Sequence, residues 1–382
     1  MDPMFVKDRL ALMLDHFSVV GDPREGCKVR YPLREVLFLV TCATIAGCDD
    51  YDEIADWGPS QGVAHLGFLQ GYSEYYFGTP KEDWLRVVLN RIEPALFEAC
   101  FTDWALTLRQ GAPDLIALDG KSLRRSGDAG HKPLHLVSAW ASTQRLVLAQ
   151  EAVDSTENEC AAMLAILNRL TITGALVTID AIATNPVMAG AILGRGGDYL
   201  LALKRNQPTL HGEVAAYFDD PATRGLTAHV DVDKDHGRIE TRTTTVSHDA
   251  GWLTGDRRHP GEHRFAGLTS LVRAVTTVER GGKISSETRY FISSPPLTPD
   301  RAAQAVRSHW GTLSLHWVLD IIFRADLSRL RRGHGAANMA LIRRLAFNMV
   351  RQGKGQRSIK TARKAAGWNT QTLVDILNTP PR

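Results

Sequence analysis

A chain of 382 residues with 44% hydrophobic side chains is long enough for two or three domains with a sizeable core. Its longest apolar stretches fall short of the roughly 18 residues that a membrane span needs, and its first residues lack the features of a secretory signal. Five cysteines without a Cys-x-x-Cys motif argue against a disulfide framework or a zinc site, so we expect a cytoplasmic protein.

The net charge of +3 hides an uneven distribution along the chain. Residues 1–110 contain 17 acidic and 10 basic side chains, whereas residues 301–382 contain 15 basic and 3 acidic ones. An imbalance sustained over some eighty residues favours a polyanionic partner such as nucleic acid over a merely solvated basic face.

Residues 1–110 are predicted to form a helical domain. The stretch Leu33–Ala46 is apolar on nearly all sides and is expected to be a buried helix, and Asp49 and Asp50 are suited to cap the helix that follows. Because this part is acidic overall, we interpret it as a module packed on a core or as a dimerisation element.

Residues 111–207 are predicted to form an α/β unit. An apolar run from Leu115 ends at Asp119, and a second one from Ala175 ends at Asp180. Between them lie a predicted hairpin (134–142 with 146–153) and a helix (158–170), and after them come a helix (186–193) and a strand (199–203). Two carboxylates at strand ends suggest a shared Mg²⁺ site, although Asp also ends many strands as a turn residue.

Residues 208–297 change to β-branched alternation, with predicted strands at 238–246, 271–278 and 285–293. His236, Arg238, Glu240 and Arg242 would share one strand face, either as an ion-pair ladder or as a phosphate contact.

The last segment opens with Pro299 and is predicted to begin with a helix that runs to about Phe323. The apolar stripe of this helix is Ala302, Val306, Trp310, Leu313, Trp317 and Ile321, which we expect to pack at least partly on a sheet. A second helix is expected over 337–350, followed by a basic stretch (354–364) that is predicted to stay disordered until it meets a partner.

Several ordered blocks of the sequence resemble the DDE transposases of bacterial insertion sequences, in particular the H-repeat-associated branch. The first block is Ala117-Leu-Asp-Gly-Lys-Ser-Leu-Arg-Arg125, and the next are His135–Trp140 and Val177–Ala181. The later blocks are Gly197–Lys204, His236–Arg242, and His309-Trp310 with Leu315–Asp320, so the resemblance covers most of the chain.

The resemblance implies an α/β fold with a ribonuclease-H-like core, a β-rich insertion and a preceding helical domain. The expected segments are a helical domain (1–110), the first part of the core (111–207), the insertion (208–297), the C-terminal core helices (298–351) and the basic tail (352–382). It also implies Mg²⁺- or Mn²⁺-dependent cleavage and strand transfer, with Asp119 and Asp180 as metal ligands. The side chains expected to contact DNA are Lys121, Arg124, Lys204, Arg238, Arg242, Arg307, His309, Arg343 and Arg344.

The third catalytic acid of the family is missing. In proteins of this family the final helix carries an Arg/His-Trp-x-Ile-Glu block. The corresponding block here is His309-Trp-Gly-Thr-Leu313, so Leu313 occupies the position of the Glu. Asp320 lies seven residues further on, roughly 10 Å along a helix, and is not expected to replace the Glu without a shift in register. Glu240 or Glu287 from the insertion remain alternatives.

The sequence therefore predicts a DNA-binding protein of the DDE-transposase type whose own cleavage and strand transfer are impaired. The alternative is a non-catalytic, repurposed DNA-binding or regulatory protein on the same scaffold. A decayed insertion-sequence product and a laboratory variant are both compatible with this sequence. In either case we expect double-stranded DNA as the partner, a homodimer on DNA, no membrane partner, and a place in the bacterial cytoplasm in association with the nucleoid.

Overall fold

The computed structural model describes residues 9–379, apart from positions 61–62, 110, 112–114, 129, 131, 154–157, 205, 236 and 255–261. His236, predicted to share a strand face with Arg238, therefore lies outside the described residues. No helix in the described ranges combines the length and apolar character needed to cross a membrane.

The N-terminal region is helical, as predicted, and it surrounds one central apolar helix. Its elements are α1 Arg9–Val19, η1 Gly26–Lys28, α2 Leu33–Ala46, α3 Tyr51–Ser60, α4 Val63–Gln70, α5 Glu82–Leu89 and α6 Pro94–Thr107. Helix α2 is buried at nearly every position, because a helix that is apolar on all sides needs neighbours on all sides. Those neighbours include α1 and α3 and, from the other end of the chain, α13, α14 and α15.

The core is one large sheet in the strand order β3-β2-β1-β4-β5-β9-β8-β7-β6. Strands β1 Leu115–Ser122, β2 His135–Ala141 and β3 Leu146–Val153 are antiparallel, which confirms the predicted hairpin. Strands β4 Leu176–Ile179 and β5 Asp198–Leu203 continue the sheet in parallel to β1. With α7 Glu159–Arg169 and α8 Pro186–Leu193, this order confirms the α/β, ribonuclease-H-like core.

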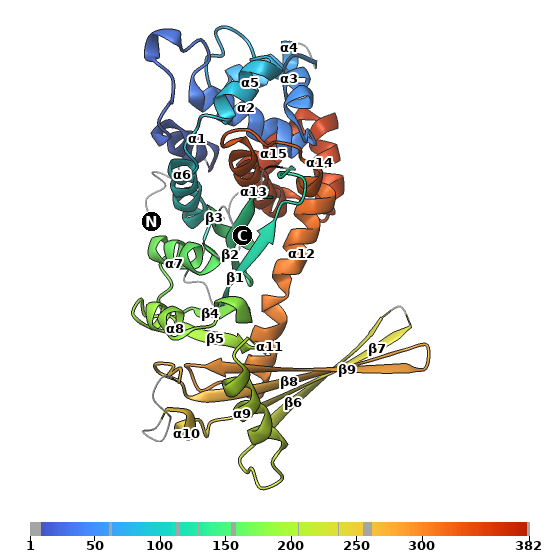
Figure 1. Cartoon of the computed structure of the whole chain (residues 1–382). Coiled ribbons are helices and arrows are strands. Elements are labelled where there is room, and N and C mark those ends of the chain that lie inside the picture. Colours follow the sequence, from blue (N-terminus) through green and yellow to red (C-terminus); the bar gives the residue numbers. More distant parts are fainter. Residues whose placement is uncertain are drawn as a thin grey trace, which may run out of the picture.

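The β-rich insertion extends the same sheet, because β9 pairs with β5. Its elements are α9 Pro208–Asp219, β6 Thr227–Asp235, β7 Arg238–Ser247, α10 Gly251–Thr254, β8 Ser270–Arg280 and β9 Lys283–Ser293. The far ends of β7, β8 and β9 project from the body as an arm (Figure 1). Strand β6 was not predicted, because its residues are polar or partly exposed along its whole length and show no buried face.

The C-terminal segment returns from the insertion to the helical body. Helices α11 Pro299–His309 and α12 Gly311–Trp317 run almost end to end between the arm and that body (Figure 1). They are followed by the π-helix η4 Val318–Ile322, η5 Ala325–Leu327, α13 Gly335–Gly353, α14 Ile359–Trp368 and α15 Thr370–Asn378. The prediction that the basic tail is disordered is wrong. Ile359, Ala362, Leu373 and Ile376 are buried, so 359–378 forms two amphipathic helices that pack on α2 and α13.

Arg343 and Arg344 were predicted to contact DNA, and this prediction is wrong. Each side chain is 2% exposed, because α13 is enclosed by other helices and the sheet. Arg343 donates to the Asp49 carbonyl at 2.9 Å, and Arg344 donates to the Ser138 hydroxyl at 3.2 Å. Their charges serve contacts inside the protein and cannot reach a phosphate in this fold.

Asn348 joins α13 to the outer strand of the core. Its side-chain amide accepts from the N–H of Val147 at 2.9 Å and donates to the C=O of Val147 at 2.8 Å. Replacing Asn348 by Leu leaves both backbone groups buried without a partner, at a cost of about 1–3 kcal/mol for each. We expect N348L to lower the free energy of unfolding, measured by urea denaturation, by about 2–4 kcal/mol.

A matched control lies one turn further along the same helix. The side-chain oxygen of Gln352 is buried but has no hydrogen-bond partner among the described residues. We expect Q352L to be close to neutral, so equal losses in the two variants would contradict the role given to Asn348.

Candidate functional site: a carboxylate pair at the ends of two parallel strands

The register between β1 and β4 sets the position of the two predicted aspartates. Leu118 pairs with Ile179, and Asp119 and Asp180 are the residues that follow in each strand. Because the strands are parallel, the two carboxylates lie side by side, as predicted. The predicted strand end at Asp119 is wrong, because β1 continues past it to Ser122 in its pairing with β2. Asp119 accepts from its neighbour's N–H (Gly120) at 2.9 Å, and Asp180 accepts from Ala181, the first residue of η3 Ala181–Ala183, at 2.8 Å.

The two carboxyl groups have opposite electrostatic surroundings. Burial, reinforced by the Asp180 and Glu159 carboxylates, raises the pKa of Asp119 to about 6 against the hydrogen bonds from Thr312 and Gly120. Burial also acts to raise the pKa of Asp180, but contact with the Lys204 ammonium outweighs it, so this pKa lies below its ordinary value. Asp119 is therefore the carboxyl group that gains most from a cation.

Lys204, at the end of β5, already supplies a cation to Asp180. Its Nζ lies 2.9 Å and 3.0 Å from the two Asp180 carboxylate oxygens. No group of three or more His, Cys, Asp or Glu side chains in the described ranges is arranged to hold a metal ion. The site thus offers two neighbouring carboxylates, one of them engaged by an ammonium group.

Helix α12 faces Asp119 with Thr312 and His316, which lie one turn apart. The Thr312 hydroxyl is within hydrogen-bonding reach of Asp119 and also donates to the His309 carbonyl at 2.8 Å. The Nδ1 atom of His316 lies 3.7 Å from Asp119, and burial lowers the pKa of this imidazole to about 3, so it is neutral. The Leu313 side chain, assigned by resemblance to the missing acid, is 51% exposed.

The second half of the predicted apolar stripe is exposed. Ala302 is buried, but Trp310, Leu313, Trp317 and Ile321 are 37%, 51%, 57% and 60% exposed. The physical reason is that the helix is not continuous: α11 ends at His309, α12 begins at Gly311, and a π-helical turn follows. Below the break it is Thr312, Leu315 and His316 that are buried.

Glu159 and His135 also belong to this site, and the sequence reading missed both. Glu159, at the start of α7, lies 3.3 Å from Nε2 of His135, whose Nδ1 lies 2.9 Å from the Ser122 hydroxyl. A Cβ atom at position 120 would lie 1.7 Å from the Glu159 carboxylate, so only glycine fits after Asp119. The sequence pattern predicted only that Glu159 lies in the first turn of the helix over 158–170.

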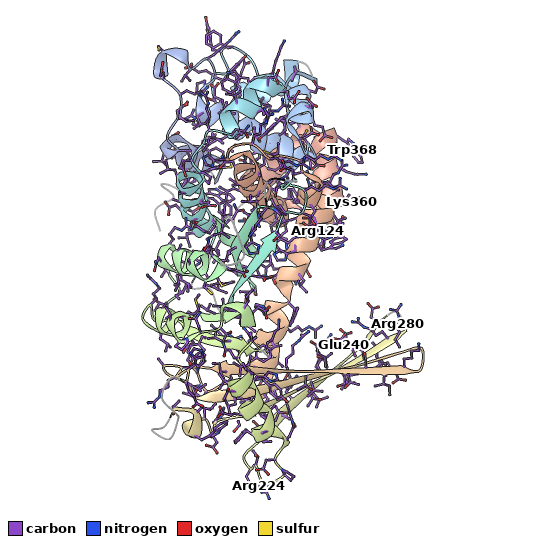
Figure 2. The ribbon with its side chains drawn as sticks, in the orientation of Figure 1. Arg124, Arg224, Glu240, Arg280, Lys360 and Trp368 are labelled. Atoms are coloured by element: carbon purple, nitrogen blue, oxygen red, sulfur yellow. The ribbon has the colours of Figure 1, made fainter. Side chains whose placement is uncertain are left out.

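Lys121 and Arg124, predicted to contact DNA, lie on the same strand and loop. Lys121 is already paired with Asp320 at 3.0 Å and Asp326 at 3.2 Å. Arg124 makes a longer ion pair with Asp326 at 3.5 Å, and its side chain is 82% exposed beside α12 (Figure 2). Asp320 is thus engaged by Lys121 in this structure.

Arg238, Arg242 and Arg307 line a cavity of about 580 Å³ between the arm and α11. Each is paired with a carboxylate: Arg238 with Glu240, Arg242 with Glu240 and Asp231, and Arg307 with Asp231 and Asp233. Glu287, the other alternative acid, pairs with Arg289. Both Glu240 and Glu287 therefore line the arm cavity and hold arginines there, and Figure 2 shows Glu240 on the arm.

His309, the remaining predicted contact, sits against the sheet. Its Nδ1 lies 2.9 Å from the Thr178 hydroxyl, and burial lowers the pKa of the imidazole to about 4. It is therefore neutral at physiological pH and brings no charge to a phosphate.

Comparisons with known proteins agree with this architecture. The family model described as "Transposase DDE domain" matches residues 110–349, and the one described as "DDE_Tnp_1-associated" matches residues 14–105. The chain is 33% identical to "Putative transposase YncI" of Escherichia coli O157:H7, over 96% of this chain and 94% of that protein. It is 32% identical to "H repeat-associated putative transposase YhhI" of Escherichia coli K12, over 90% of this chain and 92% of that protein.

A solved structure was also found, a cryo-EM structure of the piggyBac transposase synaptic complex with hairpin DNA. The likeness covers 99% of this chain and 83% of that one, with a TM-score of 0.44 and 10% identity, which is too low to add to the argument.

The raised pKa of Asp119 predicts a pH-dependent loss of stability. With a pKa of about 6 in the folded chain and about 4 in the unfolded chain, the folded chain binds more protons between these pH values. Stability should therefore fall as the pH rises from about 4 to about 6. D119N mimics the protonated form of Asp119. Its free energy of unfolding in urea should exceed that of the unmodified chain by up to about 3 kcal/mol at pH 8 and equal it at pH 4.

The matching substitution at Asp180 is a control that should change stability in the opposite direction. Its lowered pKa means that the ionised form is stabilised in the folded chain, and this stability is lost only as the pH falls. D180N should thus be less stable than the unmodified chain at pH 8. No gain for D119N at pH 8 would contradict the burial of its charge.

Proposed function

Because the chain belongs to the DDE transposases, in their H-repeat-associated branch, we propose that it binds double-stranded DNA while its own cleavage and strand transfer are impaired. The observation that carries this proposal is the carboxylate pair without a third acid. Asp119 and Asp180 lie side by side at the sheet edge, and the helix that faces them contributes a hydroxyl and a neutral imidazole.

The residues present fit one divalent cation. Two adjacent carboxylates are the oxygen ligands that Mg²⁺ and Mn²⁺ prefer, and a bound cation would offset the burial that raises the pKa of Asp119. Asp119 and Asp180 would hold the ion, with Lys204 released from Asp180. When bound, such an ion polarises a phosphoryl oxygen and lowers the pKa of a bound water.

The chain's own groups act around that pair. Lys204 has the reach to pass from the Asp180 carboxylate to a phosphate, since its side chain is 57% exposed. His316 and Thr312 lie against Asp119 from α12, and Glu159 and His135 occupy the space beside the α-carbon of Gly120. None of these groups is an acid that can complete the carboxylate set, since Glu159 is turned to His135.

We assign the missing acid to position 312. The resemblance alone gives Leu313, but it is the Thr312 side chain that faces Asp119, while Leu313 is half exposed. The helix is interrupted at Trp310, between the end of α11 and the start of α12, so the helical period of the sequence does not fix which side chain of α12 meets Asp119. A threonine hydroxyl is a neutral and weak substitute for a carboxylate ligand.

A non-catalytic, regulatory role on the same scaffold is the second candidate. It is favoured by Lys204, whose ammonium group sits where a cation would bind to Asp180. Such a chain would keep the DNA-binding surface and would compete with an active transposase for the DNA ends of the insertion sequence. A homodimer on DNA is part of the same proposal.

Restoring the acid separates the two assignments of the third position. We expect T312E to bind Mg²⁺ or Mn²⁺ about tenfold more tightly and to regain metal-dependent nicking of its own end DNA, because a third carboxylate adds charge and a ligand. L313E should change neither quantity. T312Q, of the same size but uncharged, controls for packing, and the shorter T312D replaces T312E if the latter does not fold.

A gain of metal affinity or nicking in L313E but not in T312E would return the third position to 313. Metal-dependent nicking by the unmodified chain that needs Asp119 would contradict the proposed impairment.

Asp231 and Asp233 compete with DNA for the arginines of the arm cavity. Each exposed ion pair is worth about 0.2–1 kcal/mol, and these two carboxylates make pairs with Arg242 and Arg307. We expect D231N/D233N to bind duplex DNA about three- to tenfold more tightly, with a steeper salt dependence, in fluorescence anisotropy. D220N/E279Q removes the same charge from the insertion without touching those arginines, and an equal gain there would show a general charge effect.

A further inference from the structure

A second cavity lies on the side of α12 that points away from the carboxylate pair. Its volume is about 400 Å³, and its polar lining consists of three arginines and three serines: Arg145, Arg307, Arg351, Ser142, Ser308 and Ser314. The rest of its described lining is glycine, aromatic and aliphatic, without Asp or Glu. Ser314 lies two residues after Thr312, roughly 200° around the helix from the face that meets Asp119.

Two of these arginines have no counter-charge. Among the described residues, the side chains of Arg145 and Arg351 make no hydrogen bond or ion pair. They lie close enough that burial and the charge of Arg145 together lower the pKa of Arg351. A partly buried guanidinium group beside another one is costly unless an anion joins them.

The backbone holds one of these arginines at the cavity's edge in an uncommon conformation. Arg145, in the tight turn between β2 and β3, has a φ of 54°, in the left-handed region where glycine is the unstrained choice. The fold thus accepts strain to place a cationic side chain at this turn. Arg307 differs from the other two, because it is also held by Asp231 and Asp233 across the arm cavity.

We propose that this cavity binds a phosphate group of a DNA backbone through Arg145 and Arg351, with the Ser308 and Ser314 hydroxyls as neutral donors. The third serine hydroxyl, that of Ser142, already donates to the Ser308 carbonyl at 3.3 Å. A guanidinium group can donate two parallel hydrogen bonds to the oxygens of one phosphate, and hydroxyl groups commonly donate further hydrogen bonds to the backbone in DNA complexes. The inference rests on the proposed function, since it supplies a strand-positioning contact to the same site.

The position of the cavity favours a DNA phosphate over a small phosphorylated molecule. Only the width of α12, roughly 10 Å, separates it from Asp119, so a strand held there passes the carboxylates within a few nucleotides. The cavity is also bordered by Ile359 at the start of α14, and the neighbouring Lys360 projects on the side to which the arm extends (Figure 2).

The test is the salt dependence of duplex binding. In fluorescence anisotropy with a labelled duplex, R145M/R351M should bind about tenfold more weakly, and the slope of log affinity against log salt should flatten by about two. R145K/R351K keeps the charges but loses the paired geometry, and should lie between. R91M/R195M removes two exposed arginines elsewhere and should bind like the unmodified chain.

Other outcomes overturn the inference in distinguishable ways. If R145M/R351M binds duplex DNA with the same affinity and salt slope as the unmodified chain, the phosphate site in this cavity is contradicted, while the proposed DNA binding stands. No duplex binding by the unmodified chain overturns both the proposed function and this inference. Calorimetric binding of inorganic phosphate that R145M/R351M abolishes, with DNA affinity intact, shows a small-molecule phosphate site instead.

Discussion

The arrangement of the whole molecule depends on one constraint: two carboxylates must lie side by side, largely out of water, where the parallel pairing of β1 with β4 ends. The two carboxylates repel each other and lose hydration on burial, and both effects raise the pKa of Asp119. The surrounding groups each reduce that cost. Lys204 neutralises Asp180, Thr312 and two backbone N–H groups donate hydrogen bonds, and Gly120 leaves the space that the buried Glu159 occupies.

The helical body explains how α12 is held against that pair. The N-terminal helices do not form a separate globule: α2 packs on α13 and α14, so both ends of the chain share one core. Arg363 ties them further, donating to the Thr44 carbonyl and to Asp49. Three C-terminal arginines (Arg343, Arg344 and Arg363) are buried in such internal contacts, so fewer cations are left for DNA than the 15-to-3 imbalance suggests.

Much of this could be predicted from the sequence, because it depends on local patterns. Apolar runs that reach Asp119 and Asp180 predicted the two strands, although β1 continues past Asp119 to Ser122. Pro186 and Pro299 marked helix starts. What could not be predicted depends on tertiary context. Arg343 and Arg344 sit on a helix whose pattern does not show that all its faces are covered, and Ile359–Asn378 reads as a basic tail until its buried positions are seen on α2 and α13. The phase of α12 depends on a break at Trp310 that an unbroken helical period cannot show.

The central claim is that the chain keeps two metal-binding carboxylates but can no longer hold a pair of metal ions. Counting bound Mn²⁺ by electron paramagnetic resonance, in a titration of the unmodified chain with D119N as reference, tests it most directly. The account predicts at most one weakly bound ion per chain, lost in D119N. Two tightly bound ions per chain would show that another acid completes the site and would contradict the account.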